Sequence, residues 1–138
     1  MPIRVNSCSK YIRAFCAFCV KLIRVQCYIK GMTNKNRAIL NQIRHVARQN
    51  VPQGSLVLLF GSRARGEERK GSDWDILIVL PKDQLRQEDY DLVSYPLVEL
   101  GWTLGEQINP IVYTRREWEA SSITPFYDNV QRDGVSLL

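Results

Sequence analysis

Residues 56–80 read LVLLFGSRARGEERKGSDWDILIVL, and this stretch decides how the rest of the chain is interpreted. A continuous apolar run at 55–60 predicts a short buried strand, which ends at the pair Gly61 and Ser62. A polar, loop-like segment follows, and residues 73–80 predict a second strand that starts with two carboxylates and is closed by Pro81. The stretch therefore predicts two strands joined by a loop, with polar groups gathered where one strand ends and the other begins.

The flanking segments predict helices and one more strand. Apolar residues recur at helical spacing after a cap at Thr33 or Asn34, namely Ile39, Leu40, Ile43, Val46 and Ala47, and Pro52 and Gly54 end that helix. Further along the chain we expect a helical region at 85–100 that Pro96 interrupts and Gly101 ends, a strand at 107–114, a helix at 115–120, a break at 121–125 and a short helix at 126–132. This order indicates an α/β (α+β) fold, in which helices flank a small mixed β-sheet.

The composition fits one globular domain. The chain has 138 residues, 45% of them apolar and 24% charged, which argues against a disordered, collagen-like or coiled-coil protein. The net charge is +5, but six Lys or Arg residues and no acid lie before Gly31, so the rest of the chain sums to −1. The basic character therefore belongs to the first thirty residues and is weak support for nucleic-acid binding by the domain.

The N-terminal segment differs from the rest of the chain. All four cysteines precede Gly31, and only Cys16 and Cys19 have the close spacing of a zinc site, so reduced thiols are favoured over a metal site or a disulfide framework. The apolar run at 14–20 is too short to cross a membrane, although a transit peptide or a membrane-surface helix stays open. We expect a cytoplasmic protein with its domain at 32–138. Residues 1–31 are a basic, cysteine-containing extension that need not belong to the domain, since Met32 is an alternative start.

The polar groups of 61–75 suggest phosphate and metal chemistry. Gly61 lets the backbone approach a ligand, the amides of Ser62 and Arg63 can face an anion, and Arg63 and Arg65 offer guanidinium groups suited to phosphate. Asp73 and Asp75 are two apart on a strand, so both point to one face, and Trp74 between them points into the core on the other. A divalent cation such as Mg²⁺ relieves the repulsion between the two carboxylates.

Each of these features alone is commonplace. A Gly-Ser pair after a strand is usually a turn, two spaced aspartates are usually a solvated strand end, and Ser72 can simply cap a loop. Together they favour phosphoryl or nucleotidyl transfer, because one strand end would present the anion cradle and its neighbour the metal ligands.

The combined string, 61–66 followed by 71–79, resembles the signature of the DNA polymerase beta-like nucleotidyltransferases, and most closely the minimal nucleotidyltransferase group. The resemblance implies a nucleotidyltransferase-like fold that transfers a nucleoside monophosphate, AMP from ATP, with two bound Mg²⁺ ions. It implies that Asp73 and Asp75 are catalytic metal ligands. It assigns the nucleotide to Gly61, Ser62, Ser72 and one or both of Arg63 and Arg65.

The chain departs from this family pattern at the third carboxylate, which the family carries on the next strand. Residues 107–114 contain no acid, and Asn109 is the nearest positional match. An amide oxygen can bind Mg²⁺, but it cannot take a proton from an acceptor. Glu106 is the alternative if the strand is shifted or bulged.

Three functions follow from these patterns. The first is an enzyme that modifies a hydroxyl group; by the resemblance, the acceptor would be a HEPN-type toxin for which this chain is the antitoxin. The second is a binding module that neutralises such a partner by contact alone, with Asn109 marking weakened catalysis. The third, nucleic-acid binding through the basic N-terminal segment, ranks last.

Overall fold

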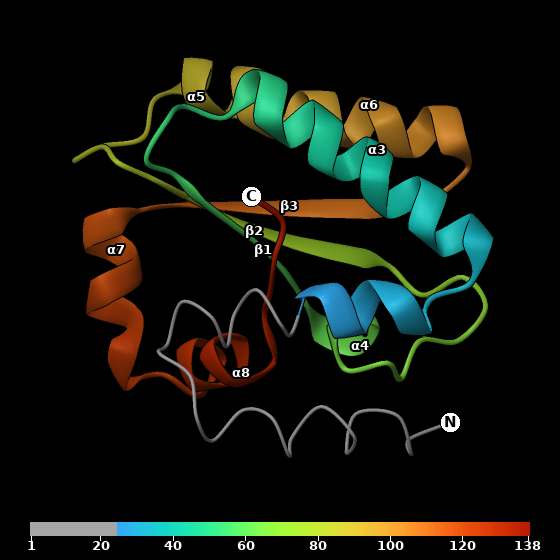
Figure 1. Cartoon of the computed structure of the whole chain (residues 1–138). Helices are drawn as coiled ribbons and strands as arrows, with labels where there is room; N and C mark the ends of the chain where they lie inside the picture. Colours follow the sequence, from blue (N-terminus) through green and yellow to red (C-terminus); the bar gives the residue numbers. More distant parts are fainter. Residues whose placement is uncertain (1–24) are drawn as a thin grey trace.

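The computed structural model describes residues 25–138, which form a four-stranded sheet with helices on both faces (Figure 1). The strands are β1 (Leu56–Phe60), β2 (Trp74–Leu80), β3 (Ile108–Thr114) and β4 (Val135–Ser136), in the order β3-β2-β1-β4. β1 runs antiparallel to β2 and β4, whereas β2 and β3 are parallel. The mixed sheet confirms the expected fold class and the three expected strands; the two-residue β4 was not predicted.

One face of the sheet is covered by α3 (Asn34–Asn50), α5 (Gln87–Val93) and α6 (Tyr95–Leu104) (Figure 1). The side chain of Thr33 accepts a hydrogen bond from the Asn36 amide, so the expected cap is confirmed. Of the apolar side chains at helical spacing in α3, all but Val46 are buried on the sheet, as the sequence predicted, and pack with Trp74 and the alternate apolar residues of β2 that follow it. Val46 is partly buried at the margin of the same core.

The helical region after β2 is two helices, with the break at Ser94 and Pro96 in the first turn of α6. Proline fits there because the first amides of a helix have no partner within it. The prediction that Gly101 ends this helix is wrong. Gly101 is buried where α6 crosses the start of β3, and a Cβ there would lie 2.7 Å from the carbonyl oxygen of Glu106. The helix ends instead at Gly105, whose φ of 66° is the left-handed conformation that glycine adopts most easily.

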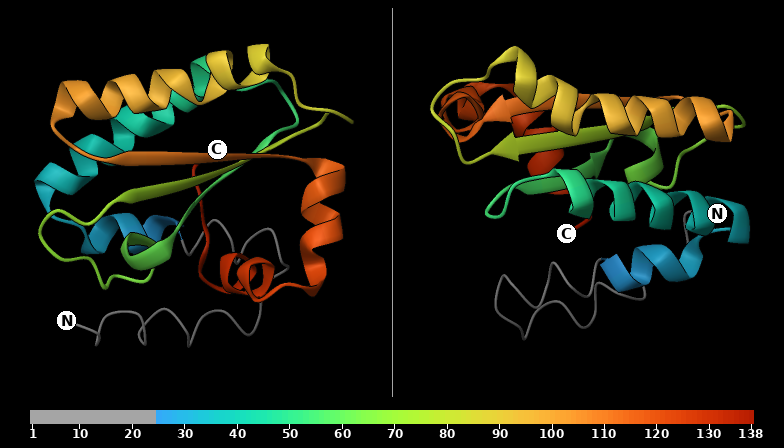
Figure 2. Two further views of the ribbon diagram at one scale, coloured as in Figure 1. Left: turned by 180° about the vertical axis from the view of Figure 1, so that it is seen from behind. Right: turned by 90° about the horizontal axis from the view of Figure 1, so that it is seen from above.

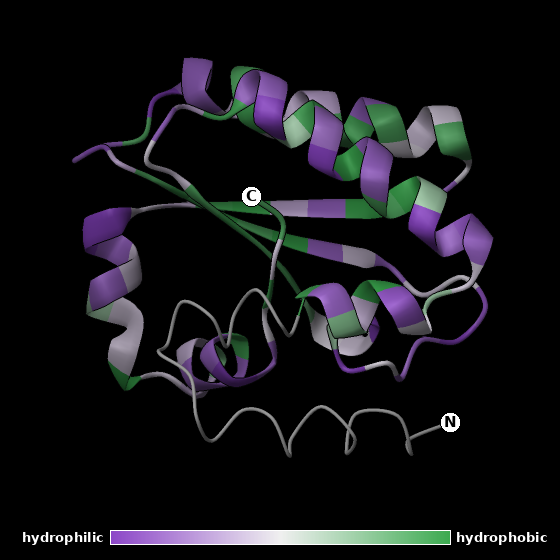
Figure 3. Cartoon of the chain, in the orientation of Figure 1, coloured by the Kyte–Doolittle hydropathy of each residue, from purple (hydrophilic) through white to green (hydrophobic). Residues whose placement is uncertain are grey.

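The other face carries α4 (Gly61–Ala64), α7 (Arg115–Ala120), the 3₁₀ turn η3 (Ser121–Ile123) and α8 (Pro125–Asp133). Trp118 of α7 is its centre, in edge-on or tilted contact with Tyr113, Phe126 and Tyr127. The strands are mainly apolar, but Figure 3 shows hydrophilic colour near the starts of β2 and β3. That polar zone, set among apolar strands, contains the candidate site.

A helix at 25–31 precedes α3 and lies beside α4 (Figures 1 and 2). Val25, Tyr28, Ile29 and Met32 pack against the core formed by α3 and the sheet. Cys27 is disulfide-bonded, so the expectation of reduced thiols is wrong at that position. The spacing of cysteines in a sequence does not reveal which thiols a fold brings together.

The other calls on the N-terminal segment, including Cys8, Cys16 and Cys19, lie outside the described residues. Within 25–138, no helix combines the length and apolar character needed to cross a membrane.

Candidate functional site

The turn after β1 is pressed against the carboxylates of β2. Phe60, the last residue of β1, lies opposite Asp75, so the turn that starts at Gly61 falls directly beside that carboxylate. Gly61 has φ 76°, and a Cβ added there would overlap the carboxylate oxygen Oδ2 of Asp75. Glycine is therefore required twice, for its backbone conformation and for the close approach of the turn to Asp75.

Asp73 and Asp75 occupy one face of the sheet, as their spacing predicted. Trp74 between them is fully buried among the α3 side of the core, whereas both aspartates are partly exposed on the opposite face. The two carboxylates thus share one surface at the start of β2, next to the Gly61 turn.

Asn109 completes this arrangement from β3. It lies in register with Asp75, and its Nδ2 donates to Asp73 Oδ2 at 3.1 Å and to Asp75 Oδ1 at 3.3 Å. Its Oδ1 accepts from Gln107 Nε2 at 3.3 Å, which fixes the amide with its donors towards the aspartates. One neutral amide therefore bridges the two carboxylates where a cation would otherwise relieve their repulsion.

Glu106 does not take part in this cluster. β2 and β3 pair without a bulge, and Glu106 lies two residues before Ile108, the first paired residue of β3, so the alternative that it replaces the third carboxylate is wrong. Its carboxylate is instead tied to Lys35 Nζ at 3.0 Å and Trp74 Nε1 at 3.3 Å, with Arg63 Nη2 at 3.6 Å. A carboxylate with these partners is a structural group.

The partners of Glu106 also set its charge. Burial raises the pKa of the Glu106 carboxyl, but hydrogen bonds from Lys35 and Trp74 outweigh that effect. The positive charges of Lys35 and Arg63 act in the same direction, and the net result is a pKa below the usual value of glutamate. Glu106 is therefore ionised at neutral pH and balances the buried guanidinium of Arg63.

The two arginines after Gly61 differ in their surroundings. Arg63 is only 5% exposed; its Nε donates to the Ser72 carbonyl at 2.9 Å and its guanidinium lies 4.1 Å from the ring centre of Trp74. Arg65 is exposed and pairs with Glu67 at 2.8 Å. The Ser72 hydroxyl accepts from the Arg69 amide at 2.8 Å, which shapes the loop before Asp73. The burial of Arg63 beneath the turn had no signal in the sequence, because its partners at 72, 74 and 106 are distant along the chain.

The donors present fit one hard divalent cation better than two. Residues 25–138 contain no cluster of three or more His, Cys, Asp or Glu side chains that could hold a metal. Asp73 and Asp75 supply carboxylate oxygens, and Asn109 can add one amide oxygen if its side chain turns over. Carboxylate and amide oxygens, completed by water and phosphate oxygens, are the ligands typical of Mg²⁺.

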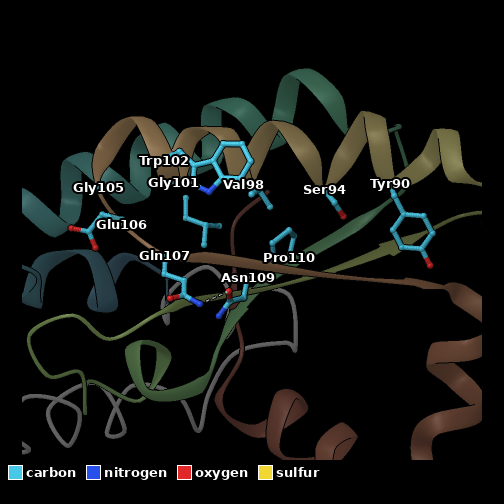
Figure 4. Close-up of a pocket in the computed structure, with 11 residues that line it drawn as sticks. Tyr90, Ser94, Val98, Gly101, Trp102, Gly105, Glu106, Gln107, Asn109 and Pro110 are labelled. Atoms are coloured by element: carbon cyan, nitrogen blue, oxygen red, sulfur yellow. Dashed lines mark hydrogen bonds between the residues drawn. The ribbon is translucent and has the colours of Figure 1, made fainter.

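A groove opens beside this cluster, between α6 and β3 (Figure 4). Its volume of about 960 Å³ is near the upper end of the range of small-molecule sites, about 300–1,000 Å³. Trp102, 68% exposed, and Tyr90, 40% exposed, lie along its helical side, and Asn109 lies on its strand side.

Comparisons with known proteins agree with this geometry. The sequence profile of the nucleotidyltransferase domain family matches residues 40–127, which include the turn, both aspartates and Asn109. No curated protein matches the chain.

Solved structures share the fold. A toxin–antitoxin crystallised with AMP-PNP is 24% identical, with a TM-score of 0.51, and the match covers 77% of this chain and 73% of the other. A mutant of the toxin–antitoxin MntA-HpeT is 22% identical, with a TM-score of 0.53 and 72% of each chain covered. The chain thus shares its fold with these two structures. The profile match over 40–127 shows that the chain belongs to the nucleotidyltransferase domain family.

Proposed function

We propose that the protein is a Mg²⁺-dependent nucleotidyltransferase that transfers AMP from ATP to a hydroxyl group. The observation that carries this proposal is the close approach of the Gly61 turn to Asp75, together with the hydrogen bonds that join Asp75 and Asp73 through Asn109 on β3. A turn whose amides could face phosphate oxygens and a pair of carboxylates that could hold a metal ion thus lie together, and transfer of a charged phosphoryl group requires such an arrangement.

The roles divide along the strand ends. We assign the β- and γ-phosphates of ATP to the backbone of Gly61 and Ser62, with Arg65 as the exposed guanidinium that can reach them. We retain Ser72 as a secondary contact through the loop that it shapes. The contacts of Arg63 with Ser72 and Trp74 favour an indirect role for this arginine beneath the turn.

Asp73 and Asp75 would hold the Mg²⁺ that accompanies the nucleotide. When bound, the ion neutralises phosphate charge and stabilises the leaving pyrophosphate. A second Mg²⁺, implied by the family resemblance, would depend on Asn109 in place of a carboxylate and should bind more weakly. The chain's own residues mainly position the nucleotide and hold charge near it, so little covalent chemistry is asked of them.

The acceptor is proposed to approach from the groove beside Asn109. Asn109 donates to both aspartates and is also one of the residues that line this groove, so the groove reaches the site at this side chain. The likeness to two toxin–antitoxin structures supports a protein acceptor, and we propose a HEPN-type toxin encountered in the cytoplasm. In the reaction, the oxygen of the acceptor hydroxyl bonds to the α-phosphorus and its proton passes to solvent. The bond from the α-phosphorus to the bridging oxygen breaks, and pyrophosphate leaves with the electron pair.

One observation favours a second candidate function. Asn109 replaces the acidic residue that the family uses to help activate the acceptor, and it already satisfies both aspartates. A chain with this change could neutralise its partner by contact, without transfer.

An isotope experiment separates the two functions. The protein is incubated with Mg²⁺, the candidate toxin and ATP labelled at either the α- or the γ-phosphate. We expect the α-label on the toxin and the γ-label in released pyrophosphate, with both lost in an Asp73→Asn/Asp75→Asn variant. A toxin that is inhibited by the protein but carries no label, with the variant inhibiting equally well, would favour neutralisation by contact.

A further inference from the structure

The helix at 25–31 makes a specific polar contact with the candidate site. The Tyr28 hydroxyl donates to the carbonyl oxygen of Arg63, 35 residues away, at 2.9 Å. The Gly66 amide donates to the same oxygen at 3.2 Å, so Tyr28 binds the carbonyl that also accepts a backbone hydrogen bond within the turn. Tyr28 is therefore linked to the backbone proposed to hold the phosphates.

The environment of Tyr28 keeps this hydroxyl protonated. Burial raises the pKa of Tyr28 well above its usual value, and the negative charge of Glu68 adds to the effect, although Arg63 opposes it. Tyr28 packs against the core together with Val25, Ile29 and Met32, so the helix that carries it is anchored on the core. The Tyr28 hydroxyl is thus a partly buried hydrogen-bond donor with a defined acceptor in the turn.

The side chain of Arg63 extends the contact to the other strands. Its Nε bond to the Ser72 carbonyl joins the turn to the loop that leads into Asp73. Its guanidinium lies on Trp74 and near Glu106, which are at the starts of β2 and β3. One buried side chain thus connects the ends of β1, β2 and β3, while its carbonyl is held by Tyr28.

We propose that Tyr28 and Arg63 are positioning residues for the nucleotide site, and that the helix at 25–31 belongs to the functional domain. Tyr28 holds the Gly61–Ala64 turn by a hydrogen bond to the backbone carbonyl of Arg63. The Arg63 side chain holds the same turn through its contacts with Ser72, Trp74 and Glu106. This inference rests on the proposed function, since it assigns the turn to the phosphates. It also means that a chain started at Met32 lacks part of its site.

The test uses the full chain with Tyr28→Phe, which removes the hydroxyl and leaves the ring. Tyr95→Phe is the matched control, because Tyr95 is 51% exposed and lies on α6, away from the turn. ATP and inorganic triphosphate are each titrated with Mg²⁺ present, and Mn²⁺ is titrated alone. The loss of one hydrogen bond should weaken ATP and triphosphate about threefold to tenfold. The affinity for Mn²⁺ should not change, because Asp73 and Asp75 are untouched; a general loss of structure would weaken all three ligands.

Hydrogen exchange tests the same inference without a nucleotide. The amides of Arg65, Gly66 and Glu67 donate to carbonyls of the turn, so their exchange reports how firmly it is held. In Tyr28→Phe these amides should exchange about threefold to tenfold faster, whereas Tyr95→Phe should match the wild type. Arg63→Lys keeps the charge without the planar fork and should have the same effect, not a rescue.

The outcomes separate this inference from the proposed function. Faster exchange in Tyr28→Phe together with no ATP binding by the wild type would support the held turn as structure and overturn its role in a nucleotide site. Unchanged exchange and unchanged ATP affinity in Tyr28→Phe would overturn the positioning role, even if the wild type binds ATP tightly.

Discussion

Replacement of Asn109 by aspartate should make the stability of the site depend on a bound cation. In the natural chain the Asn109 amide donates hydrogen bonds to both aspartates and so reduces their repulsion without a metal. The substitution removes the amide donors that lie 3.1 Å from Asp73 and 3.3 Å from Asp75 and puts a third carboxylate in their place. At such separations a pair of like charges costs about 1 kcal/mol in water and about 5 kcal/mol at an effective dielectric constant of 20. Because the side chains are partly exposed and can turn apart, we expect the low end, a loss of about 1–3 kcal/mol without metal.

The assay is thermal unfolding of wild type and Asn109→Asp in EDTA and in increasing MgCl₂, together with calorimetric titration of Mn²⁺. The variant should unfold at a lower temperature in EDTA, recover or exceed the wild-type midpoint with Mg²⁺, and bind Mn²⁺ about tenfold more tightly or better. Asn41→Asp, the same change at an exposed position of α3, is the control and should show neither effect.

Two results would refute this reasoning. An unchanged midpoint in EDTA would mean that Asn109 does not relieve the repulsion between the aspartates. An unchanged affinity for Mn²⁺ would mean that position 109 is not part of the cation site. Transfer activity is measured afterwards, and a gain in Asn109→Asp would identify the missing carboxylate as the cause of weak catalysis in the natural chain.

Three more predictions concern single side chains. Gly61→Ala should lower the free energy of unfolding by about 1–2 kcal/mol and weaken the binding of ATP at least tenfold, because φ at Gly61 is 76° and the added methyl group would overlap Asp75. Urea unfolding measures the first effect and calorimetric titration the second, and near-wild-type values for both would contradict the prediction. The lowered pKa of Glu106 contributes stability above about pH 4.5, the value in the unfolded chain, and this contribution disappears as pH falls through the lower folded pKa. Glu106→Gln should therefore destabilise the protein most near neutral pH and progressively less in acid. A loss of stability in this variant that grows as the pH falls would contradict a lowered pKa of Glu106 in the folded protein. Trp102→Ala should shift stability by no more than about 0.5 kcal/mol, because its side chain is 68% exposed; a large fall in the midpoint of thermal unfolding would place that ring in the core.

The local signals in the sequence predicted the site's framework well. The apolar run before Gly61 and the alternation through Asp73, Trp74 and Asp75 fixed the faces of two strands without reference to distant residues, because the strand period is two. The resemblance to the nucleotidyltransferases pointed to Asn109 as the residue in place of the third carboxylate, and its register opposite Asp75 agrees with that assignment.

Contacts between distant segments could not be predicted in the same way. Gly101 looks like a helix end in sequence, but glycine is needed there because the chain entering β3 leaves no room for a side chain. Arg63 has the sequence context of a surface charge, yet it is buried because its guanidinium stacks on Trp74 and lies near the carboxylate of Glu106. The sequence analysis assigned residues 1–31 to a separate extension, on their charge and cysteine content and on Met32 as an alternative start. The packing of the helix at 25–31 could not be predicted, because it depends on core residues far along the chain.

The most direct test of the central claim is calorimetric titration of ATP into the full chain with and without Mg²⁺, beside an Asp73→Asn/Asp75→Asn variant of equal stability. We predict binding by the wild type that requires Mg²⁺ and is lost in the variant, because the two carboxylates hold the ion that carries the phosphates. Absence of ATP binding to the wild type, or equal binding to the variant, would contradict a nucleotide site at the meeting point of β1, β2 and β3.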